Sequence, residues 1–286
     1  MAFPGRRAFA LGCALLAGIG TAFAQGDAKH GEYVARAAGC VGCHTDTAPG
    51  AVPFAGGRLL DTPFGKFYGP NITPHPDTGL GKWKEADFRR ALRLGERPDG
   101  AHYYPAFPYP SFTGMTDGDV RDLWAYLRGL PPASRANRAH ELRFPFGWRF
   151  LVTFWKWLYF APQPFVANPQ ATAQVNRGAY LVSALGHCGE CHTPRNFLGG
   201  LKKDRWLAGG KIPEGRVPNL TPVRLKKWND AQLREFLHTG ATPEGDAPSD
   251  AMDEVIRNTT SQLTRQDVDG LIVYLRSLPP LPEEPK

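Results

Sequence analysis

This chain has few sulfur-containing residues, and it lacks long charged or low-complexity stretches. Its 286 residues include 5 cysteines and 3 methionines. No long charged or low-complexity stretch interrupts the sequence, which argues against a largely disordered protein and predicts a globular one with room for about two domains. The formal net charge of +7 is mildly basic. A charge of this size does not support nucleic-acid binding.

The apolar run near the N-terminus is short for a membrane span. Arg6 and Arg7 precede it, it extends over residues 8–20, and the small-residue pattern Ala22-Phe23-Ala24 follows. A bilayer-spanning helix needs about 20 apolar residues, whereas a basic start, a short apolar run and an A-x-A site are typical of a cleaved secretory signal peptide. We therefore predict a signal peptide at residues 1–24 and export to the periplasm.

Four of the cysteines lie in one short motif that occurs twice. Cys40-Val41-Gly42-Cys43-His44 recurs as Cys188-Gly189-Glu190-Cys191-His192. Cys-x-x-Cys-His is the pattern of c-type haem attachment, in which the two thiols bind one porphyrin and the histidine ligates its iron. The main alternative is a zinc site made of the four cysteines. The remaining cysteine, Cys13, lies in the predicted signal peptide, so the pattern predicts two covalently bound haem c groups and no structural disulfide.

The two motifs belong to a longer internal repeat. A constant offset of 148 positions relates Cys40 to Cys188, Asn71 to Asn219, Thr116 to Thr264 and Pro131 to Pro279. Such self-similarity indicates two copies of one domain. We expect them at residues 25–132 and 173–282, joined by an aromatic-rich linker at residues 133–172.

Each copy is predicted to begin and end with a helix. Gly31-Glu32-Tyr33 and Gly178-Ala179-Tyr180 precede the motifs, where a small glycine lets another helix cross closely. Further helices are expected at residues 85–94 and 230–238. Thr116 and Thr264 resemble the first residue of a capping box, with Asp119 and Asp267 three positions later. The spacing of the apolar residues after each threonine places them on one buried face of a last helix: Val120, Leu123, Trp124 and Leu127, then Val268, Leu271, Ile272 and Leu275.

This plan, with a motif after the first helix, loops in the middle and an amphipathic last helix, resembles a class I cytochrome c domain. The resemblance covers nearly all of residues 25–286 and implies an all-α fold. It also implies that the prolines of Gly69-Pro70-Asn71 and Val217-Pro218-Asn219 direct their carbonyl groups at His44 and His192, which orients the two iron ligands.

The second iron ligand differs between the copies. Met252 lies twelve residues before Thr264, where the resemblance places the ligand of the second haem. The same offset leads from Met252 to Tyr104, in the sequence Tyr104-Pro-Ala-Phe107-Pro-Tyr109. Here the chain resembles the cytochrome c subunits of membrane-bound bacterial alcohol, gluconate and aldehyde dehydrogenases, many of which have methionine where Phe107 stands.

Three alternatives therefore remain at the first haem: His102, Met115 or an open iron. A His/His iron has a lower reduction potential than a His/Met iron. Met115 also suits a purely structural role, because an apolar residue just before a helix cap packs as a hydrophobic staple. The other histidines after residue 25 are expected on the surface or in loops: His30, His75, His140, His187 and His238.

Residues 144–160 of the linker are rich in Phe, Trp and Tyr. A short helix is expected from about Trp148, but the segment is shorter than a membrane span, and Arg149 and Lys156 interrupt it. Two interpretations remain open: an interdomain wedge, or an amphipathic segment that touches a membrane surface or a partner subunit.

The resemblance implies a periplasmic dihaem cytochrome, possessing no catalytic residue of its own, that passes single electrons from a partner dehydrogenase to a quinone, an oxidase or another cytochrome. One alternative is a dihaem redox enzyme, like a peroxidase or a thiosulfate dehydrogenase. The latter family uses a cysteine as distal ligand, and Cys40, Cys43, Cys188 and Cys191 are already assigned. The other alternative is a free mobile electron carrier.

Overall fold

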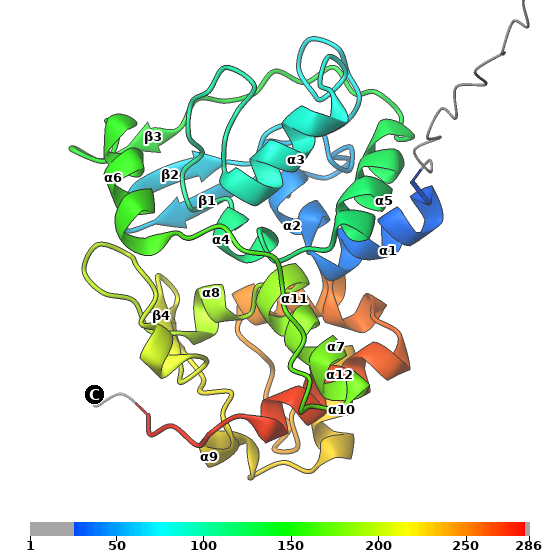
Figure 1. Ribbon diagram of the computed structural model, residues 1–286, viewed down its shortest axis with the longest axis vertical. Helices are drawn as coiled ribbons and strands as arrows, with labels where there is room; N and C mark the ends of the chain where they lie inside the picture. The colour runs from blue at the N-terminus through cyan, green and yellow to red at the C-terminus, as the bar shows by residue number, and fades with distance from the viewer. Residues whose placement is uncertain (1–25, 284–286) are drawn as a thin grey trace, which may run out of the picture.

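Two halves lie one above the other in the computed structural model, which describes residues 26–283 (Figure 1), and each has a first helix, a Cys-x-x-Cys-His helix, a two-stranded hairpin and a last helix. The first half consists of α1 (Ala28–Ala37), α2 (Cys40–His44), β1 (Leu59–Thr62), β2 (Gly65–Tyr68), α3 (Glu85–Leu94), α4 (Tyr109–Phe112) and α5 (Asp117–Arg128). The connection contains β3 (Glu141–Leu142) and α6 (Phe150–Tyr159). The second half consists of α7 (Ala173–Tyr180), the π-helical turn η1 (Leu181–Leu185), α8 (Gly189–His192), η2 (Lys203–Arg205), β4 (Gly210–Ile212), β5 (Gly215–Val217), α9 (Pro222–Leu225), α10 (Asp230–Thr239), α11 (Asp250–Asn258), η3 (Thr260–Gln262) and α12 (Arg265–Ser277).

The last helix of each half begins at the predicted cap. The hydroxyl of Thr116 accepts a hydrogen bond from Asp119 N at 3.0 Å, and that of Thr264 accepts one from Asp267 N at 3.2 Å. Each bond satisfies a backbone donor that the first turn of a helix leaves free. The predicted apolar face of α12 is buried in full, and that of α5 is buried apart from the half-buried Trp124.

A glycine lets the first and last helices of each half cross in close contact. A Cβ atom on Gly31 would lie 1.9 Å from the carbonyl oxygen of Asp122, and one on Gly178 would lie 2.0 Å from that of Gly270. Both obstacles are backbone atoms, which cannot rotate away. α1 therefore packs on α5, and α7 on α12, only because these positions have no side chain.

Two small antiparallel sheets make the all-α expectation wrong in part. The larger has the order β1-β2-β3, with Leu59 opposite Tyr68 and Gly65 opposite Leu142, and the smaller pairs β4 with β5. Gly65 and Gly215 adopt φ values of 123° and 141° at the two hairpin turns, a region that favours glycine. The strands are too short for a periodic pattern in the sequence to reveal them, so these segments looked like loops.

Reciprocal contacts join the two halves. The Tyr180 hydroxyl of the second half donates to the carboxylate of Asp119 and accepts from Thr116 N at 3.0 Å. The Tyr33 hydroxyl of the first half donates to Asp267 at 2.5 Å and accepts from Thr264 N at 3.2 Å. Each half thus supplies one tyrosine to the cap of the other half's last helix.

The segment at residues 144–160 contacts both halves along one side only. Lys156 Nζ of α6 donates to the carbonyl of Leu94 at 2.6 Å, and Trp155 Nε1 donates to that of Leu198 at 3.0 Å. Val152 is the buried residue of the helix. The opposite side of α6 is exposed, so the segment packs against the halves without being enclosed between them. None of the helices within residues 26–283 is long and apolar enough to cross a membrane.

Candidate haem-binding site

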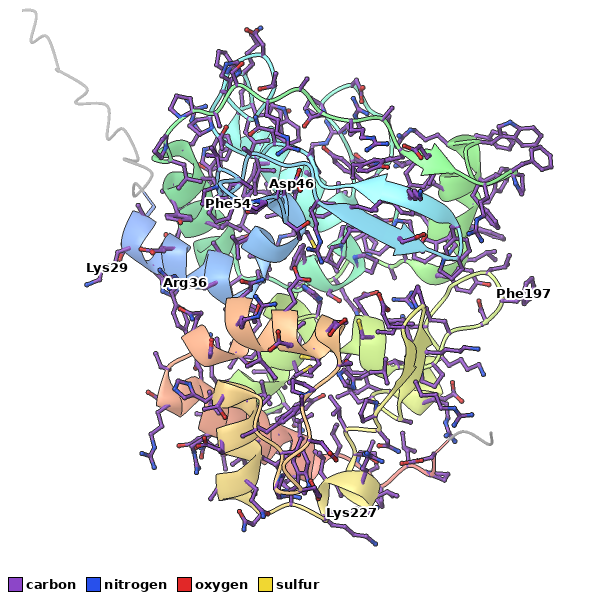
Figure 2. All side chains as sticks on the ribbon, turned by 180° about the vertical axis from the view of Figure 1, so that it is seen from behind. Lys29, Arg36, Asp46, Phe54, Phe197 and Lys227 are labelled. Carbon is purple, nitrogen blue, oxygen red and sulfur yellow. The ribbon has the colours of Figure 1, made fainter. Side chains whose placement is uncertain are left out.

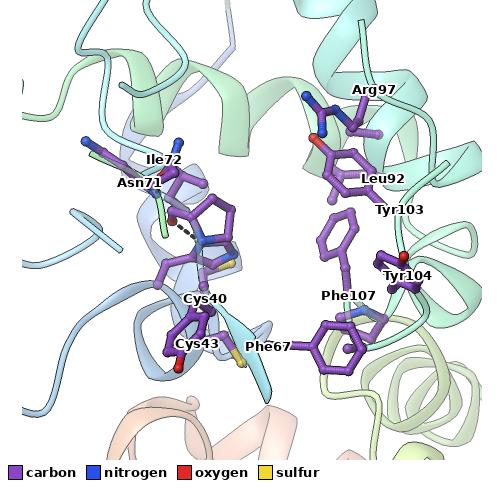
Figure 3. Close-up of a pocket in the computed structure, with 18 of the residues that line it drawn as sticks. Cys40, Cys43, Phe67, Asn71, Ile72, Leu92, Arg97, Tyr103, Tyr104 and Phe107 are labelled. Atoms are coloured by element: carbon purple, nitrogen blue, oxygen red, sulfur yellow. Dashed lines mark hydrogen bonds between the residues drawn. The ribbon is translucent and has the colours of Figure 1, made fainter. Parts of the chain in front are cut away.

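The first Cys-x-x-Cys-His motif opens onto a cavity of about 930 Å³. Cys40, Cys43 and His44 line it at one end. Figure 3 shows the opposite wall, where the rings of Tyr103 and Phe107 face the cysteines across the open space. Ligand pockets range over about 300–1,000 Å³, so this cavity is at the upper end and suits a large, mostly apolar group.

The short helix α2 gives the motif its geometry. Gly39 caps it with a φ of 62°, a left-handed conformation that glycine adopts without strain. Cys40 and Cys43 are three residues apart and therefore lie on the same side of the helical turn. Burial raises the pKa of Cys40 to about 12, so its thiol is protonated at neutral pH.

His44 is oriented by the loop that the sequence singled out. Its Nδ1 lies 2.7 Å from the carbonyl oxygen of Pro70. This bond assigns the proton to Nδ1 and leaves Nε2 as the free nitrogen of a neutral imidazole. Burial lowers the pKa of His44, against the opposing effect of the Pro70 bond. The imidazole therefore stays neutral, as an iron ligand must.

The second motif repeats this arrangement on α8. Nδ1 of His192 lies 2.8 Å from the carbonyl oxygen of Pro218, and burial lowers the pKa of His192 as well. Burial raises the pKa of Cys188 to about 12. No group of three or more His, Cys, Asp and Glu side chains within residues 26–283 is arranged as a metal site.

A buried asparagine fixes each proline loop. The side-chain oxygen of Asn71 accepts from Thr73 N at 2.9 Å, and its Nδ2 donates to the Ala133 carbonyl at 2.7 Å. Asn219 accepts from Thr221 N at 2.7 Å and donates to the Leu281 carbonyl at 2.8 Å. The segment after each last helix therefore returns to hold the loop, which explains why asparagine and the terminal prolines recur at one offset.

The three candidate distal ligands lie in different surroundings. Met115 is fully buried and lines the first cavity together with Phe107. The side chain of His102 is directed to the connection instead, because its Nδ1 lies 2.9 Å from Lys156 Nζ, and His102 does not line this cavity. Met252 is half-buried on α11, which is part of the second half.

Two histidines that the sequence placed on the surface or in loops do lie in loops, and both also line the first cavity. His140 accepts a hydrogen bond at Nδ1 from Tyr68 N at 3.2 Å. His187 comes from the second half, directly before Cys188, and its ring packs edge-on against Phe112. Its φ of 40° is unusual for a residue other than glycine. The sequence offers one sign of this conformation. At the offset of 148 positions, His187 corresponds to Gly39, whose φ is also positive.

Both motifs lie at the contact between the two halves. A Cβ atom on Gly42 would lie 3.2 Å from Oε1 of Glu254, whereas Glu190 of the second motif accepts from the Ser111 hydroxyl at 3.1 Å. Arg58 and Glu254 form an ion pair across the same contact at 2.5 Å. Each attachment helix is thus in contact with the other half.

Comparison with known proteins decides the family. The Cytochrome c family model matches residues 28–131. A diheme cytochrome c-type protein of Cereibacter sphaeroides is 46% identical over 261 residues, which cover 89% of this chain and 86% of that protein. This chain belongs to the cytochrome c family. Other cytochrome c relatives are the fructose dehydrogenase cytochrome subunit of Gluconobacter japonicus, 38% identical over 88% of this chain, and the alcohol dehydrogenase (quinone) cytochrome c subunit of Gluconobacter oxydans, 36% identical over 89%.

The predicted resemblance to dehydrogenase cytochrome subunits is therefore confirmed. This cytochrome c spans 52% and 55% of the length of those two subunits. The donor groups of its first site fit a covalently bound haem: two thiols on one side of a turn, a neutral imidazole with Nε2 free, and an apolar cavity of suitable size. A haem held there supplies one-electron redox chemistry.

Proposed function

We propose that this chain is a periplasmic dihaem cytochrome c that passes single electrons from a dehydrogenase partner toward a quinone, an oxidase or another cytochrome. The observation that carries the proposal is that both attachment motifs lie at the contact between the halves, close enough for Cys191 to raise the pKa of Cys43. Electrons can then pass between two groups within one molecule. The names of the relatives, which include cytochrome subunits of dehydrogenases, support a dehydrogenase as donor.

In this proposal the chain has two cytochrome c domains, at residues 25–132 and 173–282, joined by residues 133–172. Cys40, Cys43 and His44 hold the first haem, and Cys188, Cys191 and His192 hold the second. The Pro70 and Pro218 carbonyls orient the two histidines. The signal peptide proposed at residues 1–24 lies outside the described residues, and it supports a periplasmic location because c-type attachment motifs follow it.

Met115 is the distal ligand that we assign to the first haem, and Met252 the one for the second. Met115 is favoured over His102 because it is buried in the wall of the cavity that holds Cys40 and His44, whereas His102 is hydrogen-bonded to Lys156. Two His/Met sites give raised reduction potentials that suit electron transfer. If the first site has the lower potential, electrons enter there and leave through the second.

The distal assignment is tested with carbon monoxide, which binds a reduced haem iron only where a coordination position is open. The wild-type protein should bind none, Met115→Ala should bind about one equivalent per molecule, and His102→Ala should behave like wild type. Binding by His102→Ala with none by Met115→Ala would overturn the assignment. Met252→Ala is the matched variant for the second haem and should also bind one equivalent.

The relay itself is tested by supplying electrons. The purified protein should contain two haems per chain, and a co-purified dehydrogenase given its substrate should reduce both. Rapid turnover of hydrogen peroxide by the isolated protein, without reduction by any dehydrogenase, would instead favour the alternative of a dihaem enzyme. Equal reduction by unrelated donors would favour a mobile carrier.

A further inference from the structure

An exposed aromatic face covers the outer side of the connection between the halves. We define the aromatic face as Phe144, Trp148, Phe150, Phe154, Trp157 and Leu158, all of which are exposed, with Trp157 exposed to 83%. The last four lie at positions i, i+4, i+7 and i+8 of α6, which form one side of a helix. Monomeric proteins rarely leave such a patch without a function.

The two cations of the segment are directed away from the aromatic face. Arg149 Nη1 donates to the His102 carbonyl at 2.6 Å, and its guanidinium lies over the ring of Tyr104. Lys156 Nζ donates to the Leu94 carbonyl at 2.6 Å and contacts His102. Both charges therefore fasten the segment to the first half. The charges that interrupted the apolar sequence do not interrupt the apolar surface.

A loop of the second half extends this surface. Leu198, whose carbonyl accepts from Trp155 Nε1 at 3.0 Å, is exposed, and its neighbour Phe197 is exposed to 90%. Figure 2 shows Phe197 projecting outward at the edge of the molecule. The loop is fastened to α6, so both halves contribute apolar side chains to one side of the protein.

Exposed cations adjoin the apolar side chains in the sequence. Arg143 directly precedes Phe144, and Lys202 and Lys203 follow the loop that carries Phe197. Exposed Trp and Phe with neighbouring Lys and Arg have the composition of an element that lies at a membrane interface. The cations would meet the headgroups of anionic lipids while the rings enter the boundary below them.

We propose that the aromatic face docks on the surface of an anionic lipid bilayer and holds the protein there without spanning it. A protein partner is the poorer occupant, because a typical protein interface has about ten direct hydrogen bonds, whereas the side chains of the aromatic face offer two indole N–H groups. The proposal goes beyond the electron relay and does not depend on it. It places both halves beside the membrane, where a quinone is accessible.

The test is co-sedimentation of the haem-loaded protein with vesicles of phosphatidylcholine and phosphatidylglycerol, compared with pure phosphatidylcholine. The wild type should bind the anionic vesicles and bind the neutral ones more weakly. Phe154→Ser combined with Trp157→Ser should reduce binding to both by about tenfold or more for each side chain lost. Lys202→Gln combined with Lys203→Gln should weaken the preference for anionic lipid, with Arg143 retained, and leave binding to the neutral vesicles unchanged.

Val52→Ser is the matched control, since Val52 is an exposed apolar residue of the first half outside the aromatic face. It should bind like wild type, and all variants should keep the haem absorbance spectrum of the wild type, which separates a docking defect from misfolding. Failure of the wild type to bind, or unchanged binding by the Phe154→Ser/Trp157→Ser variant, would overturn the proposal. If the wild type does not bind vesicles and the Phe154→Ser/Trp157→Ser variant no longer co-purifies with a dehydrogenase, the aromatic face is assigned to a protein partner instead. Electron transfer in solution should be unaffected, so the relay and the docking can fail separately.

Discussion

Removing one hydroxyl from the contact between the halves should cost far more at Tyr180 than at Tyr33. Tyr180→Phe removes the donor to Asp119, which is 8% exposed, and the acceptor for Thr116 N. A hydrogen bond to a charged group contributes about 1.5–3 kcal/mol, and an unpaired buried donor costs about 1–3 kcal/mol. Asp119 keeps its contact with His30 at 2.8 Å. The expected loss in free energy of unfolding is therefore about 2–4 kcal/mol.

Tyr33→Phe is the matched variant and should lose about 1 kcal/mol. Its partner Asp267 keeps two hydrogen bonds from Arg177, at 2.8 and 2.6 Å, so the carboxylate remains paired with a permanent charge. Tyr33 is also half-buried, and water can replace its hydroxyl more readily. The two variants thus remove the same kind of hydrogen bond from two carboxylates. Asp119 is left with a histidine as its partner, and Asp267 is left with an arginine.

The assay is urea denaturation of the haem-loaded variants at pH 7, followed by circular dichroism, with the haem spectrum as a control for the native sites. The loss in the double variant should differ from the sum of the two single losses, because Arg177 binds Asp267 and lies over the Tyr180 ring, which couples the two sites. Equal losses, or a larger loss for Tyr33→Phe, would refute the reasoning that the residual partner of the carboxylate sets the cost.

Other predictions concern close packing, acid stability and loop position. Gly178→Ala should destabilise the protein by about 3 kcal/mol or more in thermal unfolding, because its Cβ would meet a backbone oxygen, whereas Gly118→Ala, whose Cβ would meet only Oγ1 of Thr116 at 3.8 Å, should not. Burial by itself would raise the pKa of Asp267, but the hydrogen bonds from Arg177 and Tyr33 outweigh it and lower this pKa. The stability from Asp267 should therefore be present above the unfolded pKa of about 4 and be lost as the pH falls through the lower folded value, and Asp267→Asn should reduce this acid sensitivity in urea titrations. Asn71→Ala should weaken the hold on Pro70 and shift the reduction potential of the first haem more than that of the second in a spectroelectrochemical titration; equal shifts would contradict the local role.

The sequence predicted the features that local chemistry determines. The attachment motifs, the caps at Thr116 and Thr264 and the buried faces of the last helices depend on residues close to one another in the chain. The bounds of α3 agree with the expected helix at residues 85–94, and α10 exceeds the expected one at residues 230–238 by a single residue. Membership of the cytochrome c family followed from these local signals and is confirmed by the relatives.

Features that depend on tertiary contacts could not be predicted. The direction of Lys156 is set by the Leu94 carbonyl, which is 62 residues away, and the position of His187 is set by the other half. The strands of both sheets are two to four residues long, which is too short for an alternating pattern of apolar and polar residues to be recognised. The tyrosines at 33 and 180 looked like ordinary helix residues because their partners lie more than 60 positions away.

The exchange of tyrosines between the halves also limits how they can move. A hinge needs one side of a contact to open, but here each half contributes a side chain to the helix cap of the other, so opening would break both at once. In the proposed relay, the step between the two haems would then be independent of protein concentration and of solvent viscosity. Only the arrival and departure of partners would be limited by diffusion.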